Sequence, residues 1–366
     1  MSDYDVIVIG GGMIGAAIGY GLSRLGQKTA LFDEGDIAFR AARGNFGLVW
    51  VQGKGLDCPQ YADWTRRSAD KWGGFICELE ELTGIDSGYS RPGGVHLCLD
   101  DEELDKRRLQ MASMEADSNG EFQSQMLDRK ALAELMPGIG PTVTGGSYSP
   151  QDGHVNPLYL LRALHAAFRA KNGLAHHEPV IDLSCKGGVF KVTTAQNTYT
   201  AAKIVLAAGL GNKQLASKVG LNVPVHPQRG QILVTEKLQP MMNYPTIYSR
   251  QTVEGSILLG DSHEDVGLDD GTSVNIMHAI ARRAIRLFPH LKQARIVRTW
   301  GALRILTPDG LPVYDQSPTC PGAFSASSHS GVTLASVHAM DFAKYVVAGE
   351  LPKSLETLSE RRFHVH

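Results

Sequence analysis

The sequence predicts an α/β protein with a Rossmann-like nucleotide-binding domain, and three adjacent features near the N-terminus support this prediction. Residues 5–9 form a nearly continuous β-branched run, which is typical of a buried parallel strand. The run leads directly into the sequence Gly10-Gly11-Gly12-Met13-Ile14-Gly15, and a helical segment over residues 16–25 follows. A second strand is predicted over residues 28–32. Together these features make a β–α–β unit of about 30 residues, the size of a dinucleotide-binding unit.

Each glycine of the turn has a separate physical task in such a unit. Gly10 permits the tight turn, Gly12 lets backbone N–H groups approach a pyrophosphate, and Gly15 lets helix and strand pack closely. The pyrophosphate then sits at the helix N-terminus, where unpaired N–H groups and the helix dipole favour an anion. An acidic residue after the second strand binds a ribose hydroxyl, and we favour Asp33 over Glu34 because it directly follows the strand. The predicted contacts are Gly10, Gly12, Met13, Ile14, Gly15, Asp33 and Glu34.

Composition narrows the class of protein. The 366 residues carry a formal net charge of −2 and are 43% hydrophobic, which excludes a basic nucleic-acid groove and a disordered acidic tail. The apolar stretch over residues 4–22 lacks a basic flank and is rich in glycine, so neither a signal peptide nor a transmembrane segment is predicted. The five cysteines contain no C-x-x-C pair. We therefore expect a cytoplasmic protein without a disulfide framework, a metal site or an iron–sulfur cluster of its own.

Three later segments favour FAD over NAD as the dinucleotide. A polar, glycine-containing loop over residues 40–48 follows the first unit at once and could line a longer cofactor, although an ordinary surface loop remains an alternative. A buried strand over residues 203–209 ends in small residues. Residues 324–332 then lead into a predicted helix over residues 333–348, whose serine and glycine cap signals suggest a second anion site near the flavin. The cofactor contacts expected here are Arg43, Gly44, Asn45, Phe46, Gly47, Leu48, Ala207, Ala208, Gly209, His329, Ser330, Gly331, Val332 and Thr333.

With these motifs in place, the sequence resembles the FAD-dependent amine and amino-acid oxidoreductases of the D-amino-acid oxidase and glycine oxidase type. The resemblance covers essentially the whole chain. Residues 44–55 and 259–262 are more narrowly similar to the β subunits of bacterial opine (octopine or nopaline) oxidases, of dye-linked D-hydroxyproline and proline dehydrogenases, and of cyanide synthase. The motifs that carry the family resemblance are residues 6–15, Asp33, and residues 43–47, 205–209, 300–312 and 328–335.

The resemblance implies two intertwined domains. A Rossmann-like FAD domain of the glutathione-reductase and D-amino-acid-oxidase type would comprise residues 1–85, 145–225 and 300–366. An antiparallel β-sheet substrate domain would comprise residues 86–144 and 226–299. Residues 100–137 have a charged helical pattern, and residues 246–259 alternate like antiparallel strands. By the same resemblance we add Val180 to the FAD contacts.

Arg304 is the principal candidate for substrate binding. Oxidation of an amine next to a carboxylate needs that carboxylate held in place, and the planar guanidinium of arginine matches it bidentately. Arg304 corresponds to the family's carboxylate-binding arginine, and we expect it to lie beside the flavin as well. Tyr248 and Arg250 follow a predicted strand and could face the flavin, with core or surface packing as the alternative.

Three further residues are candidates for proton handling. His263 and Glu264 could accept the amine proton or hold a cationic side chain of an opine, although a solvated loop explains them nearly as well. His329 could touch the flavin ring or the substrate, with a helix-cap role as the alternative. The basic face of a helix over residues 273–287 is expected to be solvated or to contact a partner.

The resemblance implies FAD-dependent oxidation of the secondary amine of an opine to an amino acid and a 2-oxo acid. The chain would be the catalytic β subunit of a hetero-oligomer, with an α subunit and a small iron–sulfur subunit as partners. Two alternatives stay open. One is a stand-alone D-amino-acid, sarcosine or glycine oxidase that uses O₂, and the other is a flavin-binding electron-relay subunit without a substrate site of its own.

Overall fold

The predicted β–α–β unit forms the centre of an eight-stranded sheet. The computed structural model describes residues 2–35 and 41–364. Strand β1 (Tyr4–Ile9) leads into helix α1 (Met13–Arg24), and β2 (Thr29–Phe32) returns parallel to β1. Residues Val6 to Ile9 are almost completely buried, as expected for a β-branched strand covered on both faces. The helix begins three residues earlier than predicted, directly after Gly12.

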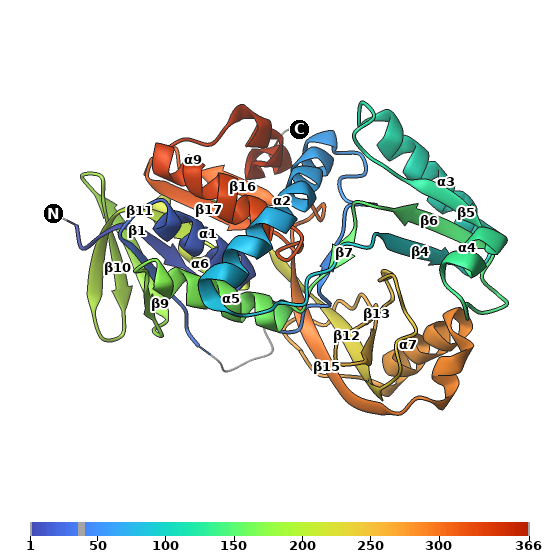
Figure 1. Cartoon of the computed structure of the whole chain (residues 1–366). Coiled ribbons are helices and arrows are strands. Elements are labelled where there is room, and N and C mark those ends of the chain that lie inside the picture. The colour runs from blue at the N-terminus through green and yellow to red at the C-terminus, as the bar shows by residue number, and fades with distance from the viewer. Residues whose placement is uncertain (1, 36–40, 365–366) are drawn as a thin grey trace.

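Segments distant in sequence complete this sheet. Its main path runs β16–β17–β11–β1–β2–β8, with a β9–β10 hairpin paired to β11 (Figure 1). Strands β8, β11 and β17 run parallel to the central pair, whereas β16 and β10 are antiparallel to their neighbours. The bounds of these strands are β8 (Leu174–His176), β9 (Val180–Lys186), β10 (Val189–Thr194), β11 (Thr198–Leu206), β16 (Val313–Gln316) and β17 (Ala323–Ser327).

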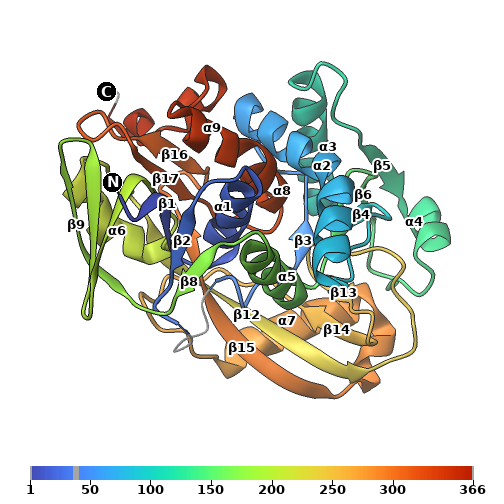
Figure 2. The same cartoon turned by 60° about the vertical axis from the view of Figure 1, so that its left-hand side comes forward.

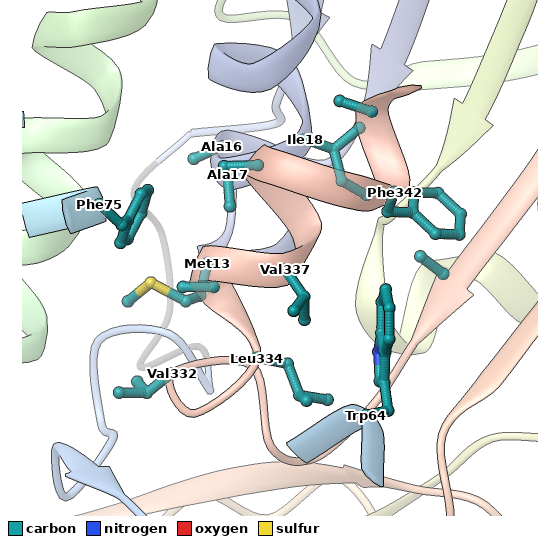
Figure 3. Packing of buried hydrophobic residues seen from close by; sticks show 14 of the residues in the cluster. Met13, Ala16, Ala17, Ile18, Trp64, Phe75, Val332, Leu334, Val337 and Phe342 are labelled. Carbon is teal, nitrogen blue, oxygen red and sulfur yellow. The ribbon is translucent and has the colours of Figure 1, made fainter. Parts of the chain in front are cut away.

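Helices from both ends of the chain cover one face of this sheet. Helix α1 packs against α5 (Pro157–Ala170) and against the C-terminal helical segment, and α2 (Pro59–Thr83) packs on both α5 and α8 (Figure 2). Figure 3 shows Met13 and Ala17 of α1 beside Val337, with Trp64 and Phe75 of α2 closing the cluster. The C-terminal segment comprises α8 (Ala335–Val337), the π-turn η4 (His338–Phe342) and α9 (Ala343–Ala348).

Two smaller antiparallel sheets make up the other part of the molecule (Figure 1). One has the order β13–β14–β12–β15 and packs against α7, and the other has the order β4–β6–β5. A short ladder joins β3 (Leu48–Val49) to β7 (Gly153–His154). The remaining bounds are β4 (Gly94–Cys98), β5 (Gln125–Asp128), β6 (Gly145–Ser149), β12 (His226–Lys237), β13 (Ser249–Gln251), β14 (Ser256–Leu259) and β15 (Ile296–Leu306), with α3 (Asp101–Ala116), α4 (Arg129–Leu135) and α7 (Val274–Leu287).

Short helical turns complete the chain. They are η1 (Gly209–Gly211), α6 (Asn212–Ala216), η2 (Ser217–Val219), η3 (Pro289–Gln293), η5 (Lys353–Leu358) and η6 (Glu360–Phe363). The mixed α/β fold class is the one that the sequence predicted. The two-domain division remains a proposal, and two strands do not follow it. Strand β15 spans the boundary at residue 300, and β6 falls in the segment 145–225 but pairs with β4 and β5 of the segment 86–144.

Two local predictions were wrong, and a third holds only in part. The charged segment over residues 100–137 is not helical throughout, because β5 pairs with β6 between α3 and α4. The C-terminal helix begins at Ala335, and its N-cap residue Leu334 makes no side-chain cap. On the basic face of α7, Arg282 and Arg286 are exposed as expected, but Arg283 forms an ion pair with Glu103 and lies 4.0 Å from the ring centre of Tyr248.

The contact between α1 and the C-terminal segment generates a prediction about Gly21. A Cβ atom placed there would lie 2.2 Å from the carbonyl oxygen of Ala339, which backbone packing cannot absorb. Gly21→Ala should therefore lower the free energy of unfolding by about 1–3 kcal/mol, the usual cost of overpacking. Gly19→Ala is the matched control, because its new Cβ would meet Phe168 at an ordinary 3.5 Å.

Thermal unfolding followed by circular dichroism measures both variants. Gly19→Ala should leave the midpoint unchanged or raise it, because alanine restricts the unfolded chain and favours helix by about 0.5–1 kcal/mol. Equal midpoints for the two variants would contradict the close packing of α1 on the C-terminal segment.

Candidate active site

A cavity of about 1070 Å³ lies at the carboxyl ends of the parallel strands. The last residues of β1 and β2, Ile9 and Phe32, lie on its wall, as do Ala207 directly after β11 and Ser327 at the end of β17. Ligands bind at this edge of open α/β sheets because the connecting loops and helix N-termini gather there. On the opposite side, residues of β12 and β15 close the cavity, so both parts of the molecule contribute to it.

The glycine turn after β1 is held in the shape that anion binding needs. Gly10 has a φ of +107°, and a Cβ there would lie 2.3 Å from the carbonyl oxygen of Ala207. A Cβ at Gly15 would lie 1.8 Å from the oxygen of Gly10, so this glycine lets α1 pack on the turn, although it does not line the cavity. Near Gly12 a Cβ would meet only Ala42, at 3.7 Å, which leaves room for a ligand.

Asp33 fixes the other side of this turn. Its carboxylate accepts hydrogen bonds from the backbone N–H groups of Gly11, at 2.7 Å, and Gly35, at 2.9 Å. Both Asp33 and its neighbour Glu34 lie on the cavity wall, as does Val180 at the start of β9. The residues predicted to bind the ribose therefore lie on the cavity wall.

A second group of donors comes from the turn between β17 and α8. Among the described residues, the backbone N–H groups of Gly331, Val332 and Thr333 have no hydrogen-bond acceptor, and all three residues line the cavity. A Cβ at Gly331 would lie 3.3 Å from Ile14, so this turn abuts the N-terminus of α1. The two anion-binding turns expected from opposite ends of the chain thus share one cavity, although no serine caps the helix.

The loop after β2 forms a further part of the wall. Gly44, Asn45, Phe46 and Leu48 line the cavity, together with Ala208 and Gly209 after β11. Arg43 and Gly47 are described but do not lie on this wall. Arg250 is buried behind the loop, where its Nε donates a hydrogen bond to the carbonyl oxygen of Phe46.

Arg304 enters the cavity from β15 with its guanidinium already oriented. Its Nη1 donates to the carbonyl oxygen of Ser262, at 2.6 Å, and its Nη2 forms an ion pair with Asp261. Burial would raise the pKa of Asp261, but the hydrogen bond from His263 and the charge of Arg304 outweigh burial, so the pKa is lowered. Among the described residues, the Nε donor of Arg304 has no acceptor, which leaves part of its fork available to a carboxylate.

His329 lies on the same wall beside Lys54. Its Nε2 is 3.5 Å from Lys54 Nζ, and its Nδ1 is 3.3 Å from the hydroxyl of Ser330. The positive charge of Lys54, burial and the charge of Arg304 together hold the pKa of His329 well below its ordinary value. The imidazole is therefore neutral at physiological pH and can accept a hydrogen bond.

The other three candidate residues lie outside the cavity wall. Tyr248 packs under Arg283 and edge-on to His96. His263 is exposed, with its Nε2 2.9 Å from a carboxylate oxygen of Asp261. Glu264 forms a 2.7 Å ion pair with the buried Arg229. In this arrangement His263 supports Asp261, and Glu264 anchors β12.

Sequence reasoning missed several residues on the cavity wall, among them Trp50, Lys54 and Asp261. Trp50 has a buried indole N–H without an acceptor among the described residues. The signal for Lys54 was a single cation in the otherwise uncharged stretch 44–55. Asp261 belonged to a motif already identified, but its partnership with Arg304 depends on how β15 passes the 260–264 loop.

The family comparison decides the class of this protein. A family model described as "DAO: FAD dependent oxidoreductase" matches residues 5–345. The chain belongs to this family. It is an FAD-dependent oxidoreductase with the fold of the family, as the sequence resemblance indicated.

Within this family, the chain is similar to opine oxidase subunits in sequence and to a glycine oxidase in structure. The chain is 43% identical to a subunit of the opine oxidase of Agrobacterium tumefaciens (strain Ach5) over 366 residues, covering 100% of this chain and 99% of the relative. It is 40% identical to the corresponding opine oxidase subunit of Rhizobium meliloti, covering 99% and 98% of the two chains. The crystal structure of glycine oxidase from Geobacillus kaustophilus superimposes with a TM-score of 0.91 at 26% identity, covering 98% of each chain.

The residues present fit the FAD that the family implies. The turn at Gly10–Gly12 leaves a cradle that side chains do not fill, and α1 points its N-terminus into it. The unpaired N–H groups of residues 331–333 and the indole N–H of Trp50 supply further donors. The cavity is at the upper end of the range of about 300–1,000 Å³ that is usual for small-molecule sites, as a long cofactor plus a substrate requires. Among the described residues, no helix is long and apolar enough to cross a membrane.

The geometry around Asp33 leads to a prediction about cofactor affinity. Asp33→Ala removes a carboxylate that both shapes the glycine turn and faces the cavity, at 2.7 Å from the N–H of Gly11. We expect the apparent Kd for FAD to rise about tenfold to a hundredfold, which corresponds to losing one or two charge-assisted hydrogen bonds. Titration of the apoprotein with FAD, followed by quenching of flavin fluorescence, measures this change.

Glu34→Ala is the comparison variant because Glu34 lines the cavity one residue further on. Since we expect Asp33 rather than Glu34 to bind the ribose hydroxyl, Glu34→Ala should raise the Kd less than Asp33→Ala does. A larger effect at Glu34 than at Asp33 would reverse the assignment of the ribose-binding acid.

Proposed function

We propose that this chain is the catalytic subunit that oxidises the C–N bond of an opine, a secondary amine joining two amino-acid-like arms. The observation that carries the proposal is the placement of Arg304 on the same cavity wall as the donors at residues 331–333. A carboxylate bound to Arg304 would hold the neighbouring amine inside this cavity. The 43% identity to a subunit of an opine oxidase supports the choice of substrate class.

FAD would be held by the turn at residues 10–14, by Asp33 and by the donors of residues 331–333. Bound FAD supplies the two-electron acceptor for the amine. The protein's own contribution is orientation and electrostatics, because the chemistry of hydride acceptance belongs to the cofactor.

The substrate amine must be neutral before it can lose a hydride from its Cα. Lys54 and Arg304 create a positive potential that already keeps His329 unprotonated. The same potential disfavours a second positive charge on a bound amine and so favours the neutral form. Trp50, Ile232 and Ala302 give this end of the cavity an apolar wall that limits water and strengthens these interactions.

The overall reaction balances with one water molecule and with FAD, which would accept the hydride. The amine loses one hydride from Cα and one proton from nitrogen, giving an imine. Water then adds to the imine carbon, and the C–N bond breaks to release an amino acid and a 2-oxo acid. His329 is the neutral base nearest to Lys54 and Arg304 that could hold the amine proton by a hydrogen bond.

We infer that electrons leave through partner subunits. The relatives are named as subunits of opine oxidases, which supports a hetero-oligomer for this chain as well. An α subunit and a small iron–sulfur subunit are the partners we propose, because the five cysteines here include no C-x-x-C pair. FAD binding by this chain is part of the same proposal.

A stand-alone amino-acid oxidase is the second candidate. The 0.91 TM-score against a glycine oxidase favours it, because the whole fold is shared with an enzyme of that name. A pure electron-relay role is less well supported, because a subunit that binds no substrate would not use a carboxylate-binding arginine on its cavity wall.

Assaying the FAD-loaded chain with an artificial dye and with oxygen separates these candidates. Opine-dependent dye reduction with little peroxide is expected for the dehydrogenase subunit. Peroxide released at a rate equal to flavin turnover would instead identify an oxidase. A flavin that stays oxidised with every amine tested, in the chain alone and with its partners, would leave only the relay role.

Arg304→Ala tests the substrate site directly. Loss of the guanidinium should raise KM by about tenfold to a hundredfold, the effect of one charge-assisted carboxylate contact, while FAD stays bound. Steady-state dye reduction and the flavin absorbance of the purified variant measure the two quantities. The matched control is Arg298→Ala, an exposed arginine earlier on β15, which should leave KM within about twofold. An unchanged KM in Arg304→Ala would remove Arg304 from the site.

A further inference from the structure

Lys54 is a cation on the cavity wall without an acidic partner. Among the described residues its Nζ forms no salt bridge, and its one hydrogen-bond neighbour is His329 Nε2, at 3.5 Å. Burial, followed by the charge of Arg304, lowers the pKa of Lys54 to about 8, so the ammonium form still dominates at pH 7. Lys54 is half-buried on this wall, and a ligand that covers it removes its remaining water, which is costly unless the ligand brings a negative group.

Unlike Lys54, Arg304 has a counter-charge and a second hydrogen-bond acceptor. Arg304 has Asp261 as a counter-charge and the carbonyl oxygen of Ser262 as a second acceptor. Lys54 has neither, although it lies on the same cavity wall and interacts electrostatically with Arg304. Among the described residues, Asp261 and Asp152 attract Lys54 without forming a salt bridge with it, and burial and the charge of Arg304 outweigh that attraction. This part of the cavity wall therefore carries an excess positive charge that a bound anion would neutralise.

His329 lies within reach of both cations. The charge of Lys54 and, less strongly, the charge of Arg304 hold its pKa well below the ordinary value. Lys54, His329 and Arg304 all line one cavity, with Lys54 Nζ 3.5 Å from His329 Nε2. Two cations and a neutral imidazole are complementary to a secondary amine that carries a carboxylate on each side of its nitrogen.

We propose that Lys54 binds the second carboxylate of the substrate and thereby selects secondary amines with a carboxylate on both sides of the nitrogen. Arg304 binds the first carboxylate, and His329 faces the amine between them. This inference rests on the proposed function, which it extends from a substrate class to the residue that distinguishes opines from ordinary amino acids. An amino acid with one carboxylate leaves the charge of Lys54 without a partner, so it binds less tightly.

Binding of two inert ethers tests the proposal without any turnover. Oxydiacetate carries two carboxylates around an ether oxygen, and methoxyacetate carries one. Perturbation of the flavin absorbance of the FAD-loaded full chain reports the Kd of each. We expect oxydiacetate to bind the wild type about ten- to a hundredfold more tightly, and Lys54→Met to reduce this preference to less than about threefold.

Two further variants make the result specific. Lys54→Arg keeps a cation and should retain most of the preference for oxydiacetate. Lys106→Met removes the charge of an exposed lysine on α3 and should leave both Kd values unchanged. Flavin content and thermal midpoint, measured for every variant, separate loss of the carboxylate contact from loss of folding or of FAD.

The kinetic arm uses an opine and the matching N-ethyl amino acid, which lacks the second carboxylate. Lys54→Met should lower kcat/KM for the opine about ten- to a hundredfold and change it little for the N-ethyl compound. Equal binding of the two ethers by the wild type, or an unchanged preference in Lys54→Met, overturns the role of Lys54. Ether discrimination without any opine oxidation overturns the proposed function but leaves the carboxylate assignment standing.

Discussion

The contact between the N-terminal glycine turn and the turn before the C-terminal helix is the constraint on which the site depends. Gly331 packs directly on Met13 and Ile14, and Gly21 lets α1 approach the backbone of Ala339. Helix N–H groups and turn N–H groups then face one cavity from opposite ends of the sequence. Neither turn could present its donors usefully if this interface opened, because each supplies only part of the binding surface.

The cavity joins two parts of the molecule that perform different tasks. The parallel sheet supplies a rigid row of strand ends, which suits a cofactor that must be placed accurately. The antiparallel strand β15 carries Arg304 across from the other part, and Asp261 and Ser262 orient its guanidinium. The charges of Lys54 and Arg304 keep His329 neutral, and the same field acts on any amine bound there.

Much of the fold could be predicted from the sequence because its signals are local. The strand, glycine turn and helix over residues 5–25 depend on spacing within a few residues, and the structure has them almost in register. The start of the C-terminal helix could not be placed, because tertiary packing around Leu334 replaces a side-chain cap. Strand β5 was hidden for a related reason, since its pairing with β6 overrides the helical pattern around it.

Site residues whose roles depend on partners far away in the sequence could not be predicted. Arg304 and His329 were identified and lie on the cavity wall, but Asp261 gains its importance only through a partner 43 positions away. Lys54 had no motif of its own, and its unpaired charge is visible only once its surroundings are known. Conversely, Arg250 and Glu264 were candidate site residues in the sequence. In the structure Arg250 donates a hydrogen bond to the carbonyl oxygen of Phe46, and Glu264 accepts one from Arg229, so both stabilise the fold around the site.

The closure of the cavity by residues 328–333 has a consequence for biosynthesis. A ribosome delivers the chain from its N-terminus, so the glycine turn and most of the sheet emerge long before the final turn. Strands β16 and β17 and the helix after them must follow before the cofactor can be fully enclosed. A complete site for FAD would therefore form only after nearly the entire polypeptide has been synthesised.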